Sequence, residues 1–374
     1  MSNSHFDSLI PDYIQRLEPY VAGKPIWEVQ EEFGLTEVVK LASNENSLGP
    51  SPRAIAALQA SLAEVHRYPD VGGLRLRQAL ADRHRLSVDN VVLGNGSEGI
   101  MSYIMRTFLD RDDEVISADA TFVGFMVMAR ARGIQPVAVP LKDYRFDLDA
   151  MADRITERTK IVYLCNPNNP TGTWFTRAEL DRFLDRLPPR VLVILDEAYF
   201  EFATDQPDFP DSMHYRHDQV ITLRTFSKAY GLAGLRIGYG MAHDFLIRNL
   251  HKVKLPFEPA IPAQAAGLGA LEDDEFLART QQMNREGLQF YYRHLERLGL
   301  EYRPSAANFV MILLDSRDQV QTLFGEMLRR GVIVRPLERF GLPHCARITV
   351  GTREENERCV EVLEEVLPRV RSRA

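Results

Sequence analysis

The chain has 374 residues, of which 45% are hydrophobic and 26% charged, a composition typical of a globular protein with room for two domains. Its 45 basic and 52 acidic residues give a formal net charge of −7, which argues against a general nucleic-acid-binding protein. Three irregularly spaced cysteines, Cys165, Cys345 and Cys359, favour reduced thiols over a disulfide framework.

Neither a targeting segment nor a membrane span is predicted. Residues 1–9 lack the basic and then apolar pattern of a signal peptide. The apolar run at residues 122–129 is too short to cross a bilayer. We therefore expect a cytoplasmic protein that contacts no membrane.

Short β-branched runs alternate with longer amphipathic ones from Val91 to about Ala242. Strands are predicted at residues 91–93, 114–117, 135–139, 160–165, 191–195, 220–223 and 237–241. Helices are predicted between several of them, at residues 98–109, 122–132, 148–155 and 177–186. This alternation predicts an α/β fold with a mostly parallel, seven-stranded sheet covered by helices on both faces. Residues that carry chemistry should then gather at the carboxyl ends of the strands.

The pattern changes after the proline-containing region at residues 256–262. A long polar helix is predicted at residues 273–298, followed by strands and helices at 309–313, 319–330, 332–335 and 347–350 and by a closing helix. This order predicts a smaller α/β domain. We expect residues 47–255 to form the large domain, and residues 1–46 and 256–374 to form the small domain together.

Residues 94–98, Gly-Asn-Gly-Ser-Glu, follow a predicted strand and begin a predicted helix. The free N–H groups and the positive dipole at such a helix start can bind a phosphate, and Ser97 can add a hydroxyl. Alone, this segment fits a plain capped turn equally well. It lacks the Gly-Lys-Ser/Thr of a P-loop.

Two other segments end predicted strands. Residues 166–172, Asn-Pro-Asn-Asn-Pro-Thr-Gly, form a rigid turn whose amides can donate to a phenolate-like oxygen, although a simple proline-rich connection is the alternative. Asp196 ends an apolar strand, where a buried carboxylate needs a partner, and a salt bridge to an arginine would suffice. Tyr199 follows three residues later and can point into the same space.

Lys228 lies between a β-rich run and the glycine-rich residues 231–240, which include Arg236. Most lysines lie on the surface, but burial beside Arg236 would lower the pKa of this amine and leave it nucleophilic. A lysine, an aspartate and an arginine suit an enzyme that holds an aldehyde cofactor as an imine. In such an enzyme the carboxylate keeps a pyridine nitrogen protonated and the arginine binds a phosphate.

In order and spacing, these segments resemble the fold type I pyridoxal-phosphate aminotransferases, and most of all the histidinol-phosphate aminotransferase family. The resemblance covers nearly the whole chain and includes residues 17–20, 40–46, 67–70 and 347–352. It implies transfer of the amino group of L-histidinol phosphate to 2-oxoglutarate, which gives imidazole-acetol phosphate and L-glutamate in histidine biosynthesis.

The resemblance also implies roles for individual residues. The catalytic residues would be Lys228, which bonds to pyridoxal 5'-phosphate, Asp196, which pairs with the pyridine nitrogen, and Tyr199. The other cofactor-binding residues would be Ser97, Glu98 through its backbone, Phe122, Asn169, Thr225, Ser227, Arg236 and Tyr68. Tyr68 would reach the phosphate of a neighbouring subunit, which implies a homodimer with shared active sites. The substrate-binding residues would be Tyr20, Asn44, Asn169, Asn308, Arg335 and Arg347.

Other readings of the sequence remain open. An aromatic amino acid aminotransferase, or a decarboxylase of a phosphoamino acid, would use the same cofactor residues, and a fold does not fix a function. A non-catalytic, cofactor-sensing protein is disfavoured because every reactive position is intact. No metal is expected, since the nine histidines show no His-Glu-x-x-His motif and no cysteine at metal-binding spacing.

Overall fold

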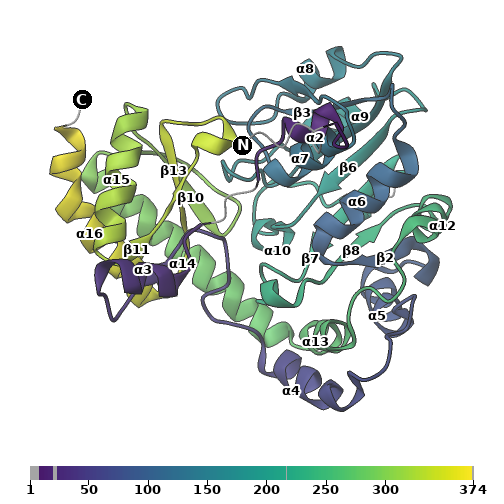
Figure 1. Ribbon diagram of the computed structural model, residues 1–374, viewed down its shortest axis with the longest axis horizontal. Coiled ribbons are helices and arrows are strands. Elements are labelled where there is room, and N and C mark those ends of the chain that lie inside the picture. Colours follow the sequence, from purple (N-terminus) through teal and green to yellow (C-terminus); the bar gives the residue numbers. More distant parts are fainter. Residues whose placement is uncertain (1–7, 20–22, 216, 373–374) are drawn as a thin grey trace.

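The computed structural model describes residues 8–19, 23–215 and 217–372. A seven-stranded sheet in the order β2-β8-β7-β6-β5-β3-β4 forms the centre of the larger part of the molecule (Figure 1). Its strands are β2 (Val91–Gly94), β3 (Glu114–Ala118), β4 (Val137–Val139), β5 (Thr159–Cys165), β6 (Leu192–Asp196), β7 (Val220–Thr225) and β8 (Gly238–Met241). β8 is antiparallel to both neighbours and the other pairs are parallel. The predicted α/β fold is confirmed.

Helices cover both faces of this sheet, and the pleat of β2 shows why. Val92 packs in one apolar cluster with Ile100 of helix α6 (Gly96–Phe108). Val91 and Leu93 point to the other face and pack with Leu80 of helix α5 (Leu74–His84). Because successive side chains of a strand point to opposite faces, a continuous apolar run fits a strand that is buried on both sides. The remaining helices around this sheet are α4 (Pro52–Ser61), α7 (Val123–Ala131), α8 (Leu148–Asp153), α9 (Arg177–Leu184), α10 (Phe200–Ala203), α11 (Ser212–Tyr215), α12 (Asp244–Val253) and α13 (Ile261–Leu271).

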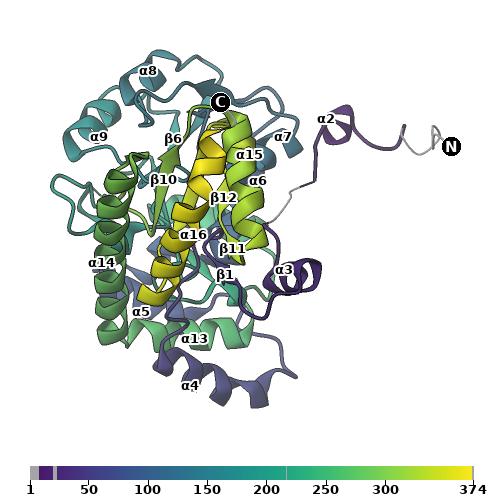
Figure 2. The same cartoon turned by 90° about the vertical axis from the view of Figure 1, so that its left-hand side faces the viewer.

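A second, four-stranded antiparallel sheet has the order β12-β13-β10-β9. Its strands are β9 (Glu301–Arg303), β10 (Phe309–Leu313), β12 (Arg335–Pro336) and β13 (Cys345–Thr349). Figure 2 shows three long helices side by side over this sheet: α14 (Asp274–Leu298), α15 (Arg317–Arg329) and α16 (Arg353–Arg371). Tyr291, Leu323 and Leu363 of these helices are buried together with Ile312 and Ile348 of the sheet.

The N-terminal segment joins this smaller part of the molecule. Strand β1 (Val39–Lys40) pairs in parallel with β11 (Val332–Ile333), and helix α3 (Ile26–Phe33) contacts α15. The single strand predicted at residues 332–335 is therefore two short strands, β11 and β12, with different partners. Helix α13 packs closely on α4, below the large sheet in Figure 1. The division at residues 47 and 255 stays a prediction.

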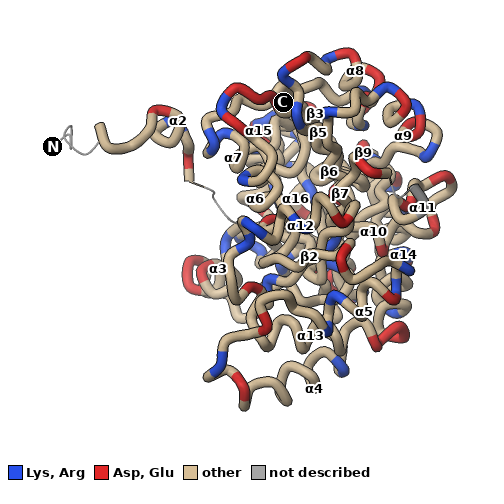
Figure 3. The backbone as a smooth tube through the Cα atoms, turned by 90° about the vertical axis from the view of Figure 1, so that its right-hand side faces the viewer, with Lys and Arg blue, Asp and Glu red and all other residues tan. Residues whose placement is uncertain are grey.

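Helix α2 (Asp12–Gln15) lies at the edge of the molecule, where it contacts α7 (Figure 3). Acidic and basic residues are interspersed along the outer helices and loops in the same view. Within the described ranges, no helix is both long enough and apolar enough to cross a membrane.

Candidate active site

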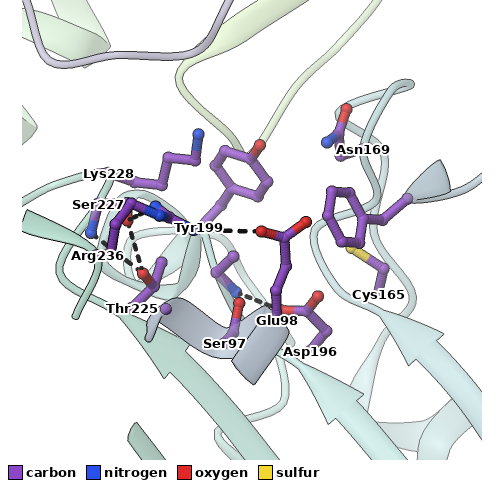
Figure 4. A pocket seen from close by; sticks show the side chains of 13 residues that line it. Ser97, Glu98, Cys165, Asn169, Asp196, Tyr199, Thr225, Ser227, Lys228 and Arg236 are labelled. Carbon is purple, nitrogen blue, oxygen red and sulfur yellow. Dashed lines mark hydrogen bonds and ion pairs between the residues drawn. The ribbon is translucent and has the colours of Figure 1, made fainter. Parts of the chain in front are cut away.

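A cavity of about 190 Å³ opens where three neighbouring parallel strands end. Cys165 ends β5, Asp196 ends β6 and Thr225 ends β7, and all three line the cavity. In Figure 4, Lys228 and Arg236 lie on one side and Asp196 and Cys165 on the other. The lining residues are Gly96, Ser97, Glu98, Phe122, Cys165, Asn169, Asp196, Ala198, Tyr199, Thr225, Ser227, Lys228 and Arg236. The structure thus brings together every predicted cofactor-binding residue except Tyr68.

Asp196 is buried at the floor of this cavity, with 3% of its surface exposed. The hydroxyl of Tyr163 donates to its Oδ2 at 2.7 Å, and the backbone N–H of Ala198 donates to its Oδ1 at 3.2 Å. Burial raises the pKa of Asp196 to about 6, although both hydrogen bonds act in the opposite direction. The carboxylate is therefore oriented by its neighbours and largely ionised at neutral pH.

The amine of Lys228 enters the same cavity and donates a hydrogen bond to the backbone oxygen of Ser43 at 3.3 Å. Burial, the largest cause, and the positive charges of Arg347 and Arg236 together lower the pKa of Lys228 to about 8, while Glu45 opposes them. A much larger fraction of this amine is neutral near pH 7 than for an exposed lysine. Such an amine can act as a nucleophile and as a base.

Hydroxyls, a guanidinium and a helix start converge at one end of the cavity. Ser97 lies in the first turn of α6, where the positive end of the helix dipole favours an anion. The backbone N–H of Ser227 donates to Thr225 Oγ1 at 3.2 Å, and Nη1 of Arg236 lies 3.4 Å from Ser227 Oγ. A Cβ on Gly238 would lie 2.6 Å from the backbone nitrogen of Ser97, so only glycine lets β8 approach the helix start this closely. These groups form an anion cradle, which we define as Ser97, Thr225, Ser227, Arg236 and the start of α6.

The sequence assigned to Glu98 only a role for its backbone, but its side chain also faces the cavity. Its Oε2 pairs with Nη2 of Arg236 at 3.2 Å, with about half of each side chain exposed. Coulombic attraction between such exposed groups is weak. The arginine can therefore exchange this partner for another anion at small cost.

The hydroxyl of Tyr199 accepts a hydrogen bond from Nδ2 of Asn44 at 2.8 Å. Asn44 is itself fixed, because Thr349 Oγ1 donates to its Oδ1 at 3.1 Å and Asn308 Nδ2 donates to its backbone oxygen at 3.2 Å. Asn308 thus supports Asn44 and does not line either cavity at this site. Burial raises the pKa of Tyr199, while Arg347 and Asn44 lower it, so the phenol is protonated at neutral pH.

A second cavity of about 530 Å³ adjoins the first and shares Glu98, Phe122, Asn169, Tyr199 and Lys228 with it. Its other lining residues are Gly23, Ala42, Ser43, Asn44, Val123, Gly124, Val127, Met128, Arg335, Phe340 and Arg347. Arg347 is 5% exposed, donates to the backbone oxygen of Ala42 at 2.9 Å and bonds to Oδ1 of Asn169. Both predicted substrate arginines therefore face the space next to Lys228.

Two predicted site residues are not brought to these cavities, Asn308 and Tyr68. Tyr20 lies outside the described residues. Tyr68 is 77% exposed and stacks on Phe257, with ring centroids 4.2 Å apart.

Two kinds of site residue were not predicted from the sequence. Tyr163 and Cys165 are two residues apart on β5, so they lie on the face that ends at the cavity, and this period could have indicated them. The apolar wall of the second cavity comes from Val123 and Val127 of α7 and from Phe340 of the short helix η4 (Glu338–Phe340). Nothing in the local pattern distinguishes these residues from ordinary core positions.

Residues 36–363 match the family described as aminotransferase class I and II, and this match spans most of the chain. The chain belongs to this family. Two relatives of this aminotransferase are histidinol-phosphate aminotransferase 2 of Carboxydothermus hydrogenoformans, 43% identical, and histidinol-phosphate aminotransferase of Moorella thermoacetica, 44% identical. Each alignment covers 95% of this chain, and 98% and 92% of the respective relative. The resemblance predicted from the sequence is confirmed.

Solved structures agree with this relationship. The crystal structure of histidinol-phosphate aminotransferase from Sinorhizobium meliloti in complex with pyridoxal-5'-phosphate has a TM-score of 0.88 at 28% identity, covering 98% of this chain and 99% of that one. Aspartate aminotransferase of Thermus thermophilus, solved with maleate, has a TM-score of 0.81 at 23% identity, covering 96% and 99% of the two chains. This second likeness shows the fold alone, which is the predicted fold type I architecture.

Proposed function

We propose that this chain is a pyridoxal-phosphate-dependent histidinol-phosphate aminotransferase of histidine biosynthesis. It would convert L-histidinol phosphate and 2-oxoglutarate to imidazole-acetol phosphate and L-glutamate. The observation that carries the proposal is the cavity at the strand ends, where Lys228, Asp196 and the anion cradle converge in a chain 43–44% identical to histidinol-phosphate aminotransferases.

The residues of the first cavity fit pyridoxal 5'-phosphate. The anion cradle suits its phosphate, the buried carboxylate of Asp196 suits a protonated ring nitrogen, and the Lys228 amine suits its aldehyde. Tyr199 and Asn169 would bind the ring oxygen, and Phe122 keeps an aromatic face for stacking without the hydroxyl of a tyrosine. When bound, the cofactor supplies an electron sink for the negative charge that develops at Cα of the amino donor.

Side chains of the protein must hold and transfer the protons near the negative charge that develops at Cα. Ionised above a pH of about 6, Asp196 would hold a proton on the pyridine nitrogen through a charge-assisted hydrogen bond. With its pKa near 8, Lys228 Nζ could remove the proton from Cα as a general base and then, as a general acid, deliver it to the carbon of the cofactor's aldehyde group. Since Asn44 donates to Tyr199 Oη, the phenol's own proton is available for the ring oxygen.

The second cavity would bind the substrates in turn. A guanidinium holds a carboxylate or a phosphate through two parallel hydrogen bonds, so the same arginines can serve both glutamate and histidinol phosphate. We assign the α-carboxylate of glutamate to Arg347, and the phosphate of histidinol phosphate to Arg335, Arg347 and Tyr20. The apolar wall of the second cavity would exclude water from the reacting atoms.

We further propose a homodimer with shared active sites. Several large apolar side chains are exposed along one stretch around α4 and α5 and on the segment that carries Phe257, namely Leu62, Val65, Tyr68, Val71, Leu74, Leu255 and Phe257. A second copy would cover them and place Tyr68 at the anion cradle of its neighbour. Sedimentation velocity tests this: a monomer at micromolar concentration would contradict it. A cytoplasmic location and the domain division at residues 47 and 255 stay predictions from the sequence.

A comparison of kcat/KM for histidinol phosphate, phenylalanine and tyrosine, with 2-oxoglutarate as acceptor, tests the substrate. Histidinol phosphate should be preferred, and a preference for phenylalanine by more than about tenfold, about 1.4 kcal/mol, would refute the proposal. Arg335→Ala should impair the phosphorylated substrate far more than phenylalanine. The cofactor is tested separately: the protein should be yellow, and borohydride should fix the cofactor to Lys228.

A further inference from the structure

Tyr163 lies behind the catalytic carboxylate, on the strand next to it. β5 and β6 are parallel neighbours in which Cys165 is opposite Asp196 and Tyr163 is opposite Ile194. Tyr163 is therefore diagonal to Asp196 on the same face of the sheet, within reach of a long aromatic side chain. Its hydroxyl donates to Asp196 Oδ2 at 2.7 Å, and the whole side chain is buried.

The position of this hydroxyl is fixed independently of Asp196. Phe125 of α7 stacks in parallel on the Tyr163 ring, with centroids 4.1 Å apart and planes inclined by 11°. Both rings are completely buried, so the stack and the strand together determine where the phenol oxygen lies. The hydroxyl thus forms a preorganised donor aimed at the carboxylate.

The hydroxyl of Tyr163 matters for the ionisation of Asp196, because the neighbouring arginine does not pair with this carboxylate. The arginine on the adjacent strand, Arg224, pairs with Glu197 at 2.7 Å rather than with Asp196. Burial opposes ionisation of Asp196, and so do the negative charges of Glu98 on α6 and Glu197 beside it. The groups that favour ionisation are two hydrogen-bond donors, the Tyr163 hydroxyl and the Ala198 N–H, one on each oxygen.

This arrangement also leaves room for a third donor. A carboxylate has about four lone-pair sites, of which Tyr163 and Ala198 use two. The remaining sites include those on the side of Asp196 that lines the cavity. A protonated ring nitrogen could therefore bond to Asp196 without displacing either donor.

We propose that Tyr163 is a positioning residue, whose hydroxyl orients the Asp196 carboxylate and keeps it ionised so that it can hold the proton on the cofactor's pyridine nitrogen. This inference rests on the proposed function. The ordinary alternative is that Tyr163 is a core aromatic residue whose hydroxyl only satisfies a buried acceptor.

Tyr163→Phe tests the proposal because it removes the hydroxyl and keeps the ring for the stack with Phe125. The first measurement uses the cofactor-free protein and follows the carboxyl infrared band that disappears in Asp196→Asn. The midpoint of its titration should rise in Tyr163→Phe by about one to two pH units, the usual worth of a hydrogen bond to a charged group. Cys165, Glu98 and Glu197 also face Asp196. They are the same in the parent and in Tyr163→Phe, so their effect on the pKa of Asp196 is the same in both proteins.

The second measurement is the Kd of pyridoxal 5'-phosphate as a function of pH. Near pH 7 the variant should bind about two- to tenfold more weakly than the parent, because the ionised fraction of Asp196 falls by that factor, and the ratio should approach one as rising pH ionises Asp196 again. A purely structural role would weaken binding by the same factor at every pH. Tyr291→Phe, which removes another fully buried tyrosine hydroxyl from the smaller sheet's core, is the matched control and should change neither measurement.

The outcomes separate this proposal from the proposed function. If the parent binds the cofactor and Tyr163→Phe leaves both midpoint and Kd unchanged, the role of Tyr163 is refuted while the proposed function stands. If the parent binds no cofactor, the proposed function fails, and the infrared titration still decides whether Tyr163 controls Asp196. Should Tyr163→Phe not fold, 3-fluorotyrosine at position 163 keeps the ring and is a stronger donor. It should lower the midpoint, and an unchanged midpoint would overturn the proposal.

Discussion

The unusual acidity of Lys228 should depend on Arg347. Between the ordinary lysine pKa of 10.5 and a value of about 8, the neutral fraction of the amine at pH 7 increases by about 300-fold. Burial is the largest cause of this change, and the guanidinium of Arg347 is the next, because two positive charges in one cavity repel each other. Arg347→Met removes that charge and should move the Lys228 pKa upward, whereas Arg347→Lys keeps a positive charge and should leave it nearly unchanged.

The assay is the rate at which pyridoxal 5'-phosphate attaches to the cofactor-free protein, followed by absorbance between about pH 6 and 10. Only the neutral amine attacks the aldehyde, so the rate should rise with pH and reach half of its plateau near pH 8 in the parent and at a higher pH in Arg347→Met. Arg335→Met is a control, since Arg335 lines the same cavity but is not among the main causes of the Lys228 shift. A parent profile that levels off only above pH 10, or an Arg347→Met profile identical to the parent, would refute the reasoning.

Three further predictions concern the carboxylate, the anion cradle and the core. Asp196→Ala should lower kcat by about a thousandfold or more while the circular dichroism spectrum is unchanged, and near-normal turnover would contradict its pairing with the pyridine nitrogen. Gly238→Ala should weaken pyridoxal 5'-phosphate binding at least about tenfold by displacing the start of α6, whereas a Cβ on Gly234 meets no atom within 4 Å and Gly234→Ala should bind normally. Leu363→Ala should lower the free energy of unfolding, measured in urea, by about 2–5 kcal/mol, because the Leu363 side chain is completely buried. Glu361→Ala should lower it by less than about 0.5 kcal/mol, because Glu361 is exposed. A Leu363→Ala cost as small as that of Glu361→Ala would show that the core closes around the lost volume.

The sequence was sufficient for the large sheet and for most of the first cavity. Continuous β-branched runs such as residues 160–165 can be buried on both faces, and a strand that ends in Asp196 places that carboxylate at a known edge of the sheet. The identities of Lys228 and Arg236 then indicated the chemistry. These signals are local, so a single sequence contains them.

Features that depend on long-range contacts could not be predicted in this way. β1 and β11 have two residues each, which is too short for a periodic pattern. They pair with each other although most of the chain separates them in sequence. The contact of Tyr163 with Asp196 requires the register between β5 and β6, which the sequence of either strand alone does not contain. The apolar wall made by Val127 and Phe340 likewise exists only after α7 and η4 are brought together.

The hydrogen bonds around Asn44 have a consequence for biosynthesis of the protein. Asn44 and Thr349 are separated by 305 positions, yet Thr349 fixes the amide that binds the phenol of Tyr199. A ribosome releases the chain from its N-terminus, so the large sheet can form while Thr349 has yet to be translated. The nascent protein can therefore form its anion cradle early, but Asn44 can be fixed beside Tyr199 only after the last strand has been translated.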